Sequence, residues 1–195
     1  MMRNAFVIGL LIIVGNSAWS QIPKDELHYY TFSEAKNAFA DTIYAIDLSR
    51  EGLTQIPEDL KQFKNLKGLK LSKNKLENLP EFFTSFKQLE FLYADKNKFT
   101  YFPSQIFHLS DIIYLDISRN KMSSIPAGIK NLTNLKYLDV WDNRFTAIDL
   151  TFAELQQLVF IDLRGTTFAV SFVEKWTLAF PNAEVKFDKP CNCLD

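Results

Sequence analysis

Residues 66–80 run Leu66-Lys-Gly-Leu69-Lys-Leu71-Ser-Lys-Asn74-Lys-Leu76-Glu-Asn-Leu79-Pro80, and this stretch decides the fold. Leu69 and Leu71 alternate with polar residues, which is the period of a short strand. An asparagine follows the strand, and a proline follows the last apolar residue. The same pattern recurs every 23 residues along the chain, without insertion or deletion.

The recurrence defines six equal units that together cover residues 43–169, and the units begin at residues 43, 66, 89, 112, 135 and 158. A lone strand of this length is not stable. Units stacked about 4.8 Å apart form a parallel sheet and share one continuous core, so each unit is stabilised by its neighbours. The period therefore predicts a solenoid.

The pattern Leu-x-x-Leu-x-Leu-x-x-Asn-x-Leu-x-x-Leu-Pro resembles that of the leucine-rich-repeat family, in its small secreted bacterial type. The resemblance implies an α/β fold, with a curved parallel sheet on the concave side and turns with short 3-10 segments on the convex side. It also implies that one column of asparagines hydrogen-bonds the turns and the neighbouring repeats: Asn74, Asn97, Asn120 and Asn143.

The segment before the repeats, residues 21–42, is expected to cap the N-terminal end of the stack, since a bare solenoid end exposes core and unpaired strand groups. Thr31 and Glu34 have the spacing of a capping box at the start of a helix. We expect this helix to extend over Ser33–Ala40 and to cover the first unit.

The segment after the repeats, residues 170–195, is expected to form a C-terminal cap and a tail. Ser171 and Glu174 repeat the capping signature, and Pro181 ends the predicted helix Phe172–Phe180. Residues 183–187 alternate like a strand. We expect that strand to join the sheet after the sixth unit.

Residues 1–20 have the order of a secretory signal peptide. Arg3 is their only charge, an apolar run spans Ala5–Gly15, and the small residues Ala18 and Ser20 follow. The run is shorter than the roughly 20 apolar residues that span a bilayer. We therefore expect an exported chain without a transmembrane segment after cleavage, located in the periplasm, at the cell surface or secreted. An uncleaved anchor is the alternative.

No motif for catalysis, for phosphate binding or for metal binding stands out. The only histidines are His28 and His108, and Cys191 and Cys193 lack a neighbouring base. Export permits a disulfide between the two cysteines, but their pairing stays open. A net charge of -1 argues against a nucleic-acid partner. We predict a non-enzymatic protein with no catalytic residue, no metal and no cofactor.

Three columns of the repeat point outward on the concave face. The third position places aromatic residues on four successive strands, and the fifth position places carboxylates on the last three. We expect the aromatic band to be exposed to water, and we find no local benefit that offsets the repulsion between stacked carboxylates. The predicted partner-binding residues are Phe91, Tyr93, Tyr114, Asp116, Tyr137, Asp139, Trp141, Phe160 and Asp162.

Two functions are compatible with this surface. The first is a protein-protein interaction module that binds a protein or peptide with positive charge, because the family mostly mediates protein contacts. The second is a cell-surface glycan-binding protein that stacks sugars on the same aromatic stripe. A purely structural ladder, in which the aromatic residues stabilise only neighbouring strands, is the remaining alternative.

Overall fold

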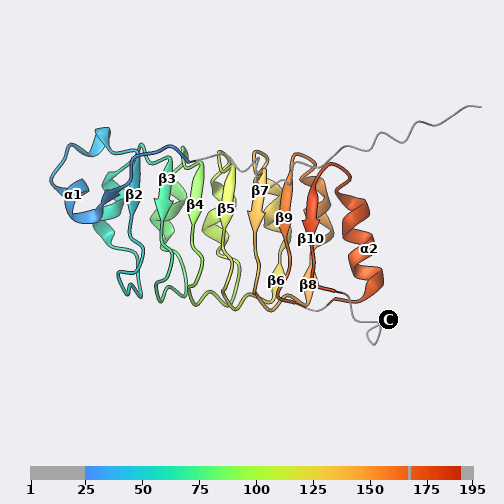
Figure 1. Cartoon of the computed structure of the whole chain (residues 1–195). Coiled ribbons are helices and arrows are strands. Elements are labelled where there is room, and N and C mark those ends of the chain that lie inside the picture. The colour runs from blue at the N-terminus through green and yellow to red at the C-terminus, as the bar shows by residue number, and fades with distance from the viewer. Residues whose placement is uncertain (1–24, 167, 190–195) are drawn as a thin grey trace, which may run out of the picture.

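The computed structural model describes residues 25–166 and 168–189. Its main feature is an eight-stranded sheet in which every neighbouring pair is parallel (Figure 1). The strands follow one another in chain order as β1 (Tyr30–Thr31), β2 (Ala45–Asp47), β3 (Gly68–Lys70), β4 (Phe91–Tyr93), β5 (Tyr114–Asp116), β7 (Tyr137–Asp139), β9 (Phe160–Asp162) and β10 (Glu184–Lys186). The predicted solenoid is therefore confirmed.

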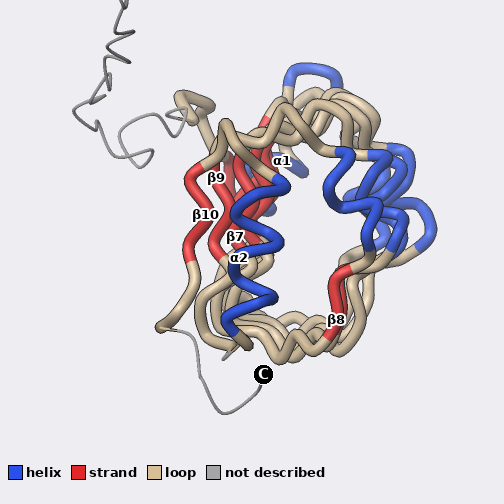
Figure 2. Tube along the Cα trace, turned by 90° about the vertical axis from the view of Figure 1, so that its right-hand side faces the viewer, coloured by secondary structure: helices blue, strands red, loops and turns tan. Residues whose placement is uncertain are grey.

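Short 3-10 helices form the wall opposite the sheet (Figure 2). Four of them follow the repeat prolines, and the fifth follows Asp149, whose carboxylate accepts a hydrogen bond from the Thr151 N–H at 2.9 Å. A two-stranded parallel sheet of β6 (Ser124–Ile125) and β8 (Ala147–Ile148) supplements this side. The helices are η3 (Glu58–Gln62), η4 (Glu81–Ser85), η5 (Ser104–His108), η6 (Ala127–Asn131) and η7 (Leu150–Glu154).

The core lies between the sheet and the 3-10 helices and runs the length of the stack. The repeated leucine and isoleucine positions of the strands are fully buried, as are Phe83 and Phe86 of the second unit. Burial of one such side chain stabilises the fold by about 1.5–3 kcal/mol. The hydrophobic period thus determines which face of each strand is buried. It also places the 3-10 helices against that face.

The asparagine column forms the predicted hydrogen-bond ladder between units. Asn97 donates from Nδ2 to the Leu71 carbonyl at 2.9 Å and to the Ala94 carbonyl at 3.1 Å. Its Oδ1 accepts from the Leu76 N–H at 3.1 Å. Each side chain thus closes its own turn and joins it to the preceding unit. Asn74, Asn120 and Asn143 repeat these contacts.

The N-terminal cap consists of β1, helix α1 (Phe32–Lys36) and the 3-10 helix η2 (Ala40–Thr42). The capping box is present, since Thr31 Oγ1 accepts from the Glu34 N–H and Glu34 accepts from the Thr31 N–H. The predicted helix Ser33–Ala40 was too long. The helix ends where Asn37 donates to the Ser33 carbonyl, and Phe39, 86% exposed, adds no buried apolar face beyond that point.

The C-terminal cap is the helix α2 (Val170–Ala179), which lies across the end of the stack and is followed by β10 (Figure 2). Trp176 is buried against Phe152 and Phe180. The expected capping box at Ser171 was wrong, because the helix begins two residues earlier than predicted, with Ala169 as its N-cap and no side-chain cap. Residues 1–20, Cys191 and Cys193 lie outside the described residues.

Within residues 25–166 and 168–189, no helix has the length and apolar character needed to cross a membrane.

Candidate functional site on the sheet face

The predicted columns of the concave face have the predicted register. Tyr114 on β5 pairs with Phe91 on β4 and with Tyr137 on β7, and Phe160 on β9 continues the row. The next column runs from Tyr93 through Asp116 and Asp139 to Asp162 in the same register. Trp141 lies in the turn after β7, two residues beyond Asp139. The sheet therefore brings all nine predicted residues together on one face.

The expectation of an aromatic band exposed to water was wrong. Phe91 is 9% exposed, Tyr137 7% and Phe160 2%. Tyr137 and Phe160 form a small apolar cluster with Tyr114 and with Ile113 and Val159, which precede their strands by one residue. The Tyr114 ring lies 5.1 Å from that of Tyr93 and 6.4 Å from that of Tyr137. These rings therefore pack mainly against one another.

The carboxylate column has a local role that the sequence analysis missed. Asp116 accepts a hydrogen bond from the Ser118 N–H at 3.0 Å, and Asp139 accepts from the Trp141 N–H at 3.0 Å. Asp162 makes the same contact to the residue two positions on. Each aspartate thus closes the turn after its strand, as side chains of this type commonly do. This local benefit contradicts the expectation that none exists.

Two of the three carboxylates, Asp116 and Asp139, form no ion pair among the described residues. Burial, followed by the nearby Asp95, raises the pKa of Asp116 to about 6, although the Ser118 hydrogen bond and Arg119 oppose the shift. Burial and the neighbouring Asp116 and Asp162 raise the pKa of Asp139 to about 7, against the Trp141 N–H and Arg164. Desolvation and like charge both disfavour the ionised form.

Asp162 differs from these two because it has a cationic partner. The Arg164 guanidinium donates from Nε to Oδ1 at 2.9 Å and from Nη2 to Oδ2 at 2.6 Å. Asp162 is fully buried, and its hydrogen bonds raise the pKa of Arg164. Arg164 also lies over the Trp141 ring at 5.9 Å, and Arg119 lies over the same ring at 4.2 Å. One end of the column is therefore closed by arginines.

A short segment before β1, residues 25–29, crosses the other end of the concave face, and we call it the N-terminal strap (Figure 1). Asp25 accepts hydrogen bonds from the Tyr29 hydroxyl and, at 3.2 Å, from the Tyr93 hydroxyl. The Lys70 ammonium lies 3.6 Å from the centre of the Tyr29 ring. Tyr93 is thus engaged by the strap, and the open part of the face begins at β5.

Gly68 makes room for the strap. A Cβ at this position would contact the Tyr29 hydroxyl and would approach Leu27 Cδ1 to 2.8 Å. We expect Gly68→Val to displace the strap and to cost about 1–3 kcal/mol of stability through overpacking, although valine favours strands. Hydrogen exchange would show faster exchange at Leu27 and Tyr29. Higher stability with unchanged exchange would contradict the assignment.

The raised carboxyl pKa values predict how stability changes with pH. A carboxyl whose pKa is higher in the folded than in the unfolded state stabilises the fold when protonated, and this contribution is lost as pH rises through the folded value. We expect the double variant Asp116→Asn/Asp139→Asn to have the same free energy of unfolding as the wild type near pH 4. Asparagine resembles the protonated acid and keeps the turn hydrogen bond. Near pH 8 the variant should be more stable than the wild type, by about 1.4 kcal/mol for each unit by which each pKa is raised. Denaturant unfolding across this range measures the difference, and equal stability at both pH values would contradict the raised values.

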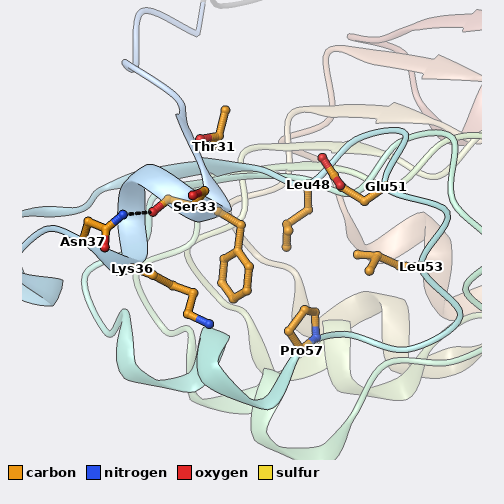
Figure 3. Close-up of a pocket in the computed structure, with 9 residues that line it drawn as sticks. Thr31, Ser33, Lys36, Asn37, Leu48, Glu51, Leu53 and Pro57 are labelled. Atoms are coloured by element: carbon orange, nitrogen blue, oxygen red, sulfur yellow. Dashed lines mark hydrogen bonds between the residues drawn. The ribbon is translucent and has the colours of Figure 1, made fainter.

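A separate cavity of about 510 Å³ lies between the N-terminal cap and the first unit (Figure 3). Thr31, Phe32 and Lys36 of the cap face Leu48, Glu51 and Leu53 of the unit. Glu51 occupies the position of the asparagine ladder, which is interrupted in this unit. The cavity contains none of the predicted site residues. Within the described residues, no group of three His, Cys, Asp or Glu side chains is placed to hold a metal ion.

The comparisons with known proteins agree with this architecture. Residues 41–99 match the sequence model described as leucine rich repeat. The fold is similar to that of a leucine-rich-repeat protein from Leptospira interrogans, with a TM-score of 0.60 and 23% identity over 83% of this chain and 54% of that one. The comparison with curated protein sequences finds no match.

A second similar structure is the plant peptide hormone receptor RGFR1 in complex with RGF2. It has a TM-score of 0.56 and 23% identity over 70% of this chain and 22% of the receptor chain. This chain thus spans about half of the Leptospira protein and about a fifth of the receptor. The repeat, the parallel sheet and the match over residues 41–99 together define a leucine-rich-repeat solenoid fold.

Proposed function

We propose that this protein is a non-enzymatic interaction module that binds a protein or peptide with positive charge on its concave face. The contact would centre on Tyr114, Asp116, Asp139 and Trp141, which are only partly buried. Phe91, Tyr137, Phe160 and Asp162 would support these residues from below, and Tyr93 would border the N-terminal strap. Action outside the cytoplasm is part of the proposal and rests on the signal-like residues 1–20.

The carboxylate pair Asp116 and Asp139 carries this proposal. An asparagine at either position would accept the same turn hydrogen bond without a charge, so turn closure alone does not require a carboxylate. A cationic group from a partner would remove the repulsion between the two and would lower both raised pKa values. The excess negative charge is therefore best explained by a ligand that carries the opposite charge.

Two further observations support a protein or peptide over a glycan. The rings of Phe91, Tyr137 and Phe160 are too buried to offer faces for sugar stacking. The Trp141 ring is already approached by Arg119. In addition, the structurally similar plant peptide hormone receptor RGFR1 is known in complex with RGF2.

The proposal is tested by a pull-down from the organism's own cell envelope. The bait is the chain from Gln21, compared with Asp116→Asn/Asp139→Asn and with Glu81→Gln/Glu154→Gln, a control pair with the same charge change on the exposed 3-10 helices η4 and η7, opposite the sheet. We expect a protein that the wild type and the control capture, that salt releases, and that the first variant fails to capture. Capture that is equal for all three baits would contradict the proposal.

A glycan array with the same three proteins distinguishes the glycan-binding alternative from binding of a protein or peptide. Saturable sugar binding that is lost in Trp141→Ala but retained in Asp116→Asn/Asp139→Asn would replace the protein partner with a glycan.

A further inference from the structure

A second charged surface lies on another side of the molecule, where the loops that follow the strands form one edge of the stack, the lower edge in Figure 1. Two columns of the repeat line this edge, at the eighth and tenth positions on either side of the buried asparagine. They supply eight of the 22 lysines and arginines of the chain. We call this set the basic edge: Arg50, Lys73, Lys75, Lys96, Lys98, Arg119, Lys121 and Arg144.

Among the residues that the structure describes, no cation of the basic edge forms an ion pair. The ion pairs of the described residues all lie elsewhere, and none includes a member of the edge. Arg119 contacts the Trp141 ring and its charge also acts on Asp116, although the two form no ion pair. Three exposed carboxylates share this side of the molecule, Glu51, Glu77 and Asp142, and they are outnumbered. The edge therefore has excess positive charge although the whole chain has a net charge of -1.

The backbone conformation at the eighth position does not favour a lysine or an arginine. Arg50, Lys73, Lys96 and Arg119, like the acidic Asp142 in the fifth unit, have φ between 52° and 65°, the left-handed region in which a side chain is disfavoured. The sixth unit has Gly165 at the same position, with φ of 88°. Glycine would suit every turn of this column better than a long basic residue, so the charge has to be explained by something outside the fold.

The shape of the edge indicates which kind of partner would meet it. The four rungs of each column are about 4.8 Å apart, so that the cations cover a strip rather than a point. Arg144 borders a cavity next to α2, and the cavities at the N-terminal cap, beside Ile113 and beside β6 and β8 include no member of the basic edge. Tyr101, 78% exposed, projects from the same loop as Lys98. Tyrosine is a residue type that membrane-water interfaces favour.

We infer that the basic edge binds an anionic lipid bilayer surface, with Tyr101 at the level of the headgroups. This contact orients the stack with its loops on the membrane and leaves the concave face open at the side. Each basic residue near such a surface adds to the attraction, which salt screens within a Debye length.

The test is sedimentation of the chain from Gln21 with phosphatidylglycerol-containing vesicles, compared with pure phosphatidylcholine vesicles. The edge variant carries glutamine at Lys73, Lys75, Lys98 and Lys121, all exposed. Its control carries glutamine at Lys61, Lys64, Lys87 and Lys130, equally exposed on the side of the 3-10 helices. We expect the edge variant to bind anionic vesicles about a hundredfold or more weaker, about fivefold for each lysine, and the control to bind like the wild type.

Tyr101→Ser should weaken binding without changing its salt dependence, and an unchanged affinity would contradict this orientation. If the edge variant and the control lost the same affinity for anionic vesicles, the net charge of the protein would explain the binding. That result would overturn the inference. Failure of the wild type to prefer anionic vesicles would also overturn it. So would binding of the soluble polyanion polygalacturonate without binding of vesicles, which would assign the edge to an acidic glycan.

Discussion

Asn120→Ala is expected to lower the free energy of unfolding by about 3–5 kcal/mol, because it leaves several buried backbone groups unpaired at about 1–3 kcal/mol each. Asn120 Oδ1 accepts from the Phe99 N–H at 3.1 Å. Its Nδ2 donates to the carbonyls of Ala94 at 3.2 Å and of Ile117 at 3.0 Å. Alanine replaces none of these contacts, and water cannot enter, since Asn120 is 7% exposed.

Chemical denaturation of Asn120→Ala and of a control measures this loss. Asn78→Ala suits the control, because Asn78 is exposed and lies outside the ladder. We expect the control to stay within about 0.5 kcal/mol of the wild type. A loss below about 1 kcal/mol in Asn120→Ala would mean that the ladder does not hold the units together.

Trp176→Ala is expected to cost about 3–5 kcal/mol, the range for removing a large buried aromatic side chain. The ring lies 5.6 Å from that of Phe152 in the fifth unit and 6.2 Å from that of Phe180. Its loss would detach α2 from the end of the stack and expose the core and the sheet end, which promotes association between chains. Thermal unfolding and light scattering should therefore change together.

Trp176→Phe provides the matched control for the cap. The indole Nε1 is buried and has no hydrogen-bond partner among the described residues, so phenylalanine removes an unsatisfied donor while it keeps an aromatic ring. We expect a change within about 1.5 kcal/mol. Comparable destabilisation by alanine and phenylalanine would show that packing against Phe152 and Phe180 is not what holds the cap.

The repeat made the register of the sheet predictable. A constant spacing of 23 residues places equivalent residues on adjacent strands, which is why Tyr114 and Tyr137 are neighbours as expected. The caps were predictable in kind, because the capping box of Thr31 and Glu34 marks the start of α1 and Pro181 follows the end of α2, although the capping signature at Ser171 does not mark a helix start. The first and last residues of the cap helices were not predictable, since the end of α1 depends on the Asn37 side chain and on the exposed position of Phe39.

The exposure of the site was not predictable from the period. The solvent exposure of an outward-facing ring depends on side chains in neighbouring columns and on segments outside the repeats. Ile113 and Val159 bury Tyr137 and Phe160, and the N-terminal strap engages Tyr93. Gly68 in a column that is otherwise largely aromatic was the available signal for the strap. The turn role of the aspartates could have been inferred from their position at strand ends.

The proposed role of the concave face depends on whether Asp116 and Asp139 respond to a cationic ligand. Carboxyl NMR titration of the two side chains, with and without a lysine-rich peptide, measures this directly. We expect pKa values of about 6 and about 7 in the free protein, a decrease of both when the peptide is bound, and tighter binding at pH 8 than at pH 5. Values that the peptide leaves unchanged, with an affinity that does not vary with pH, would contradict recognition by these carboxylates.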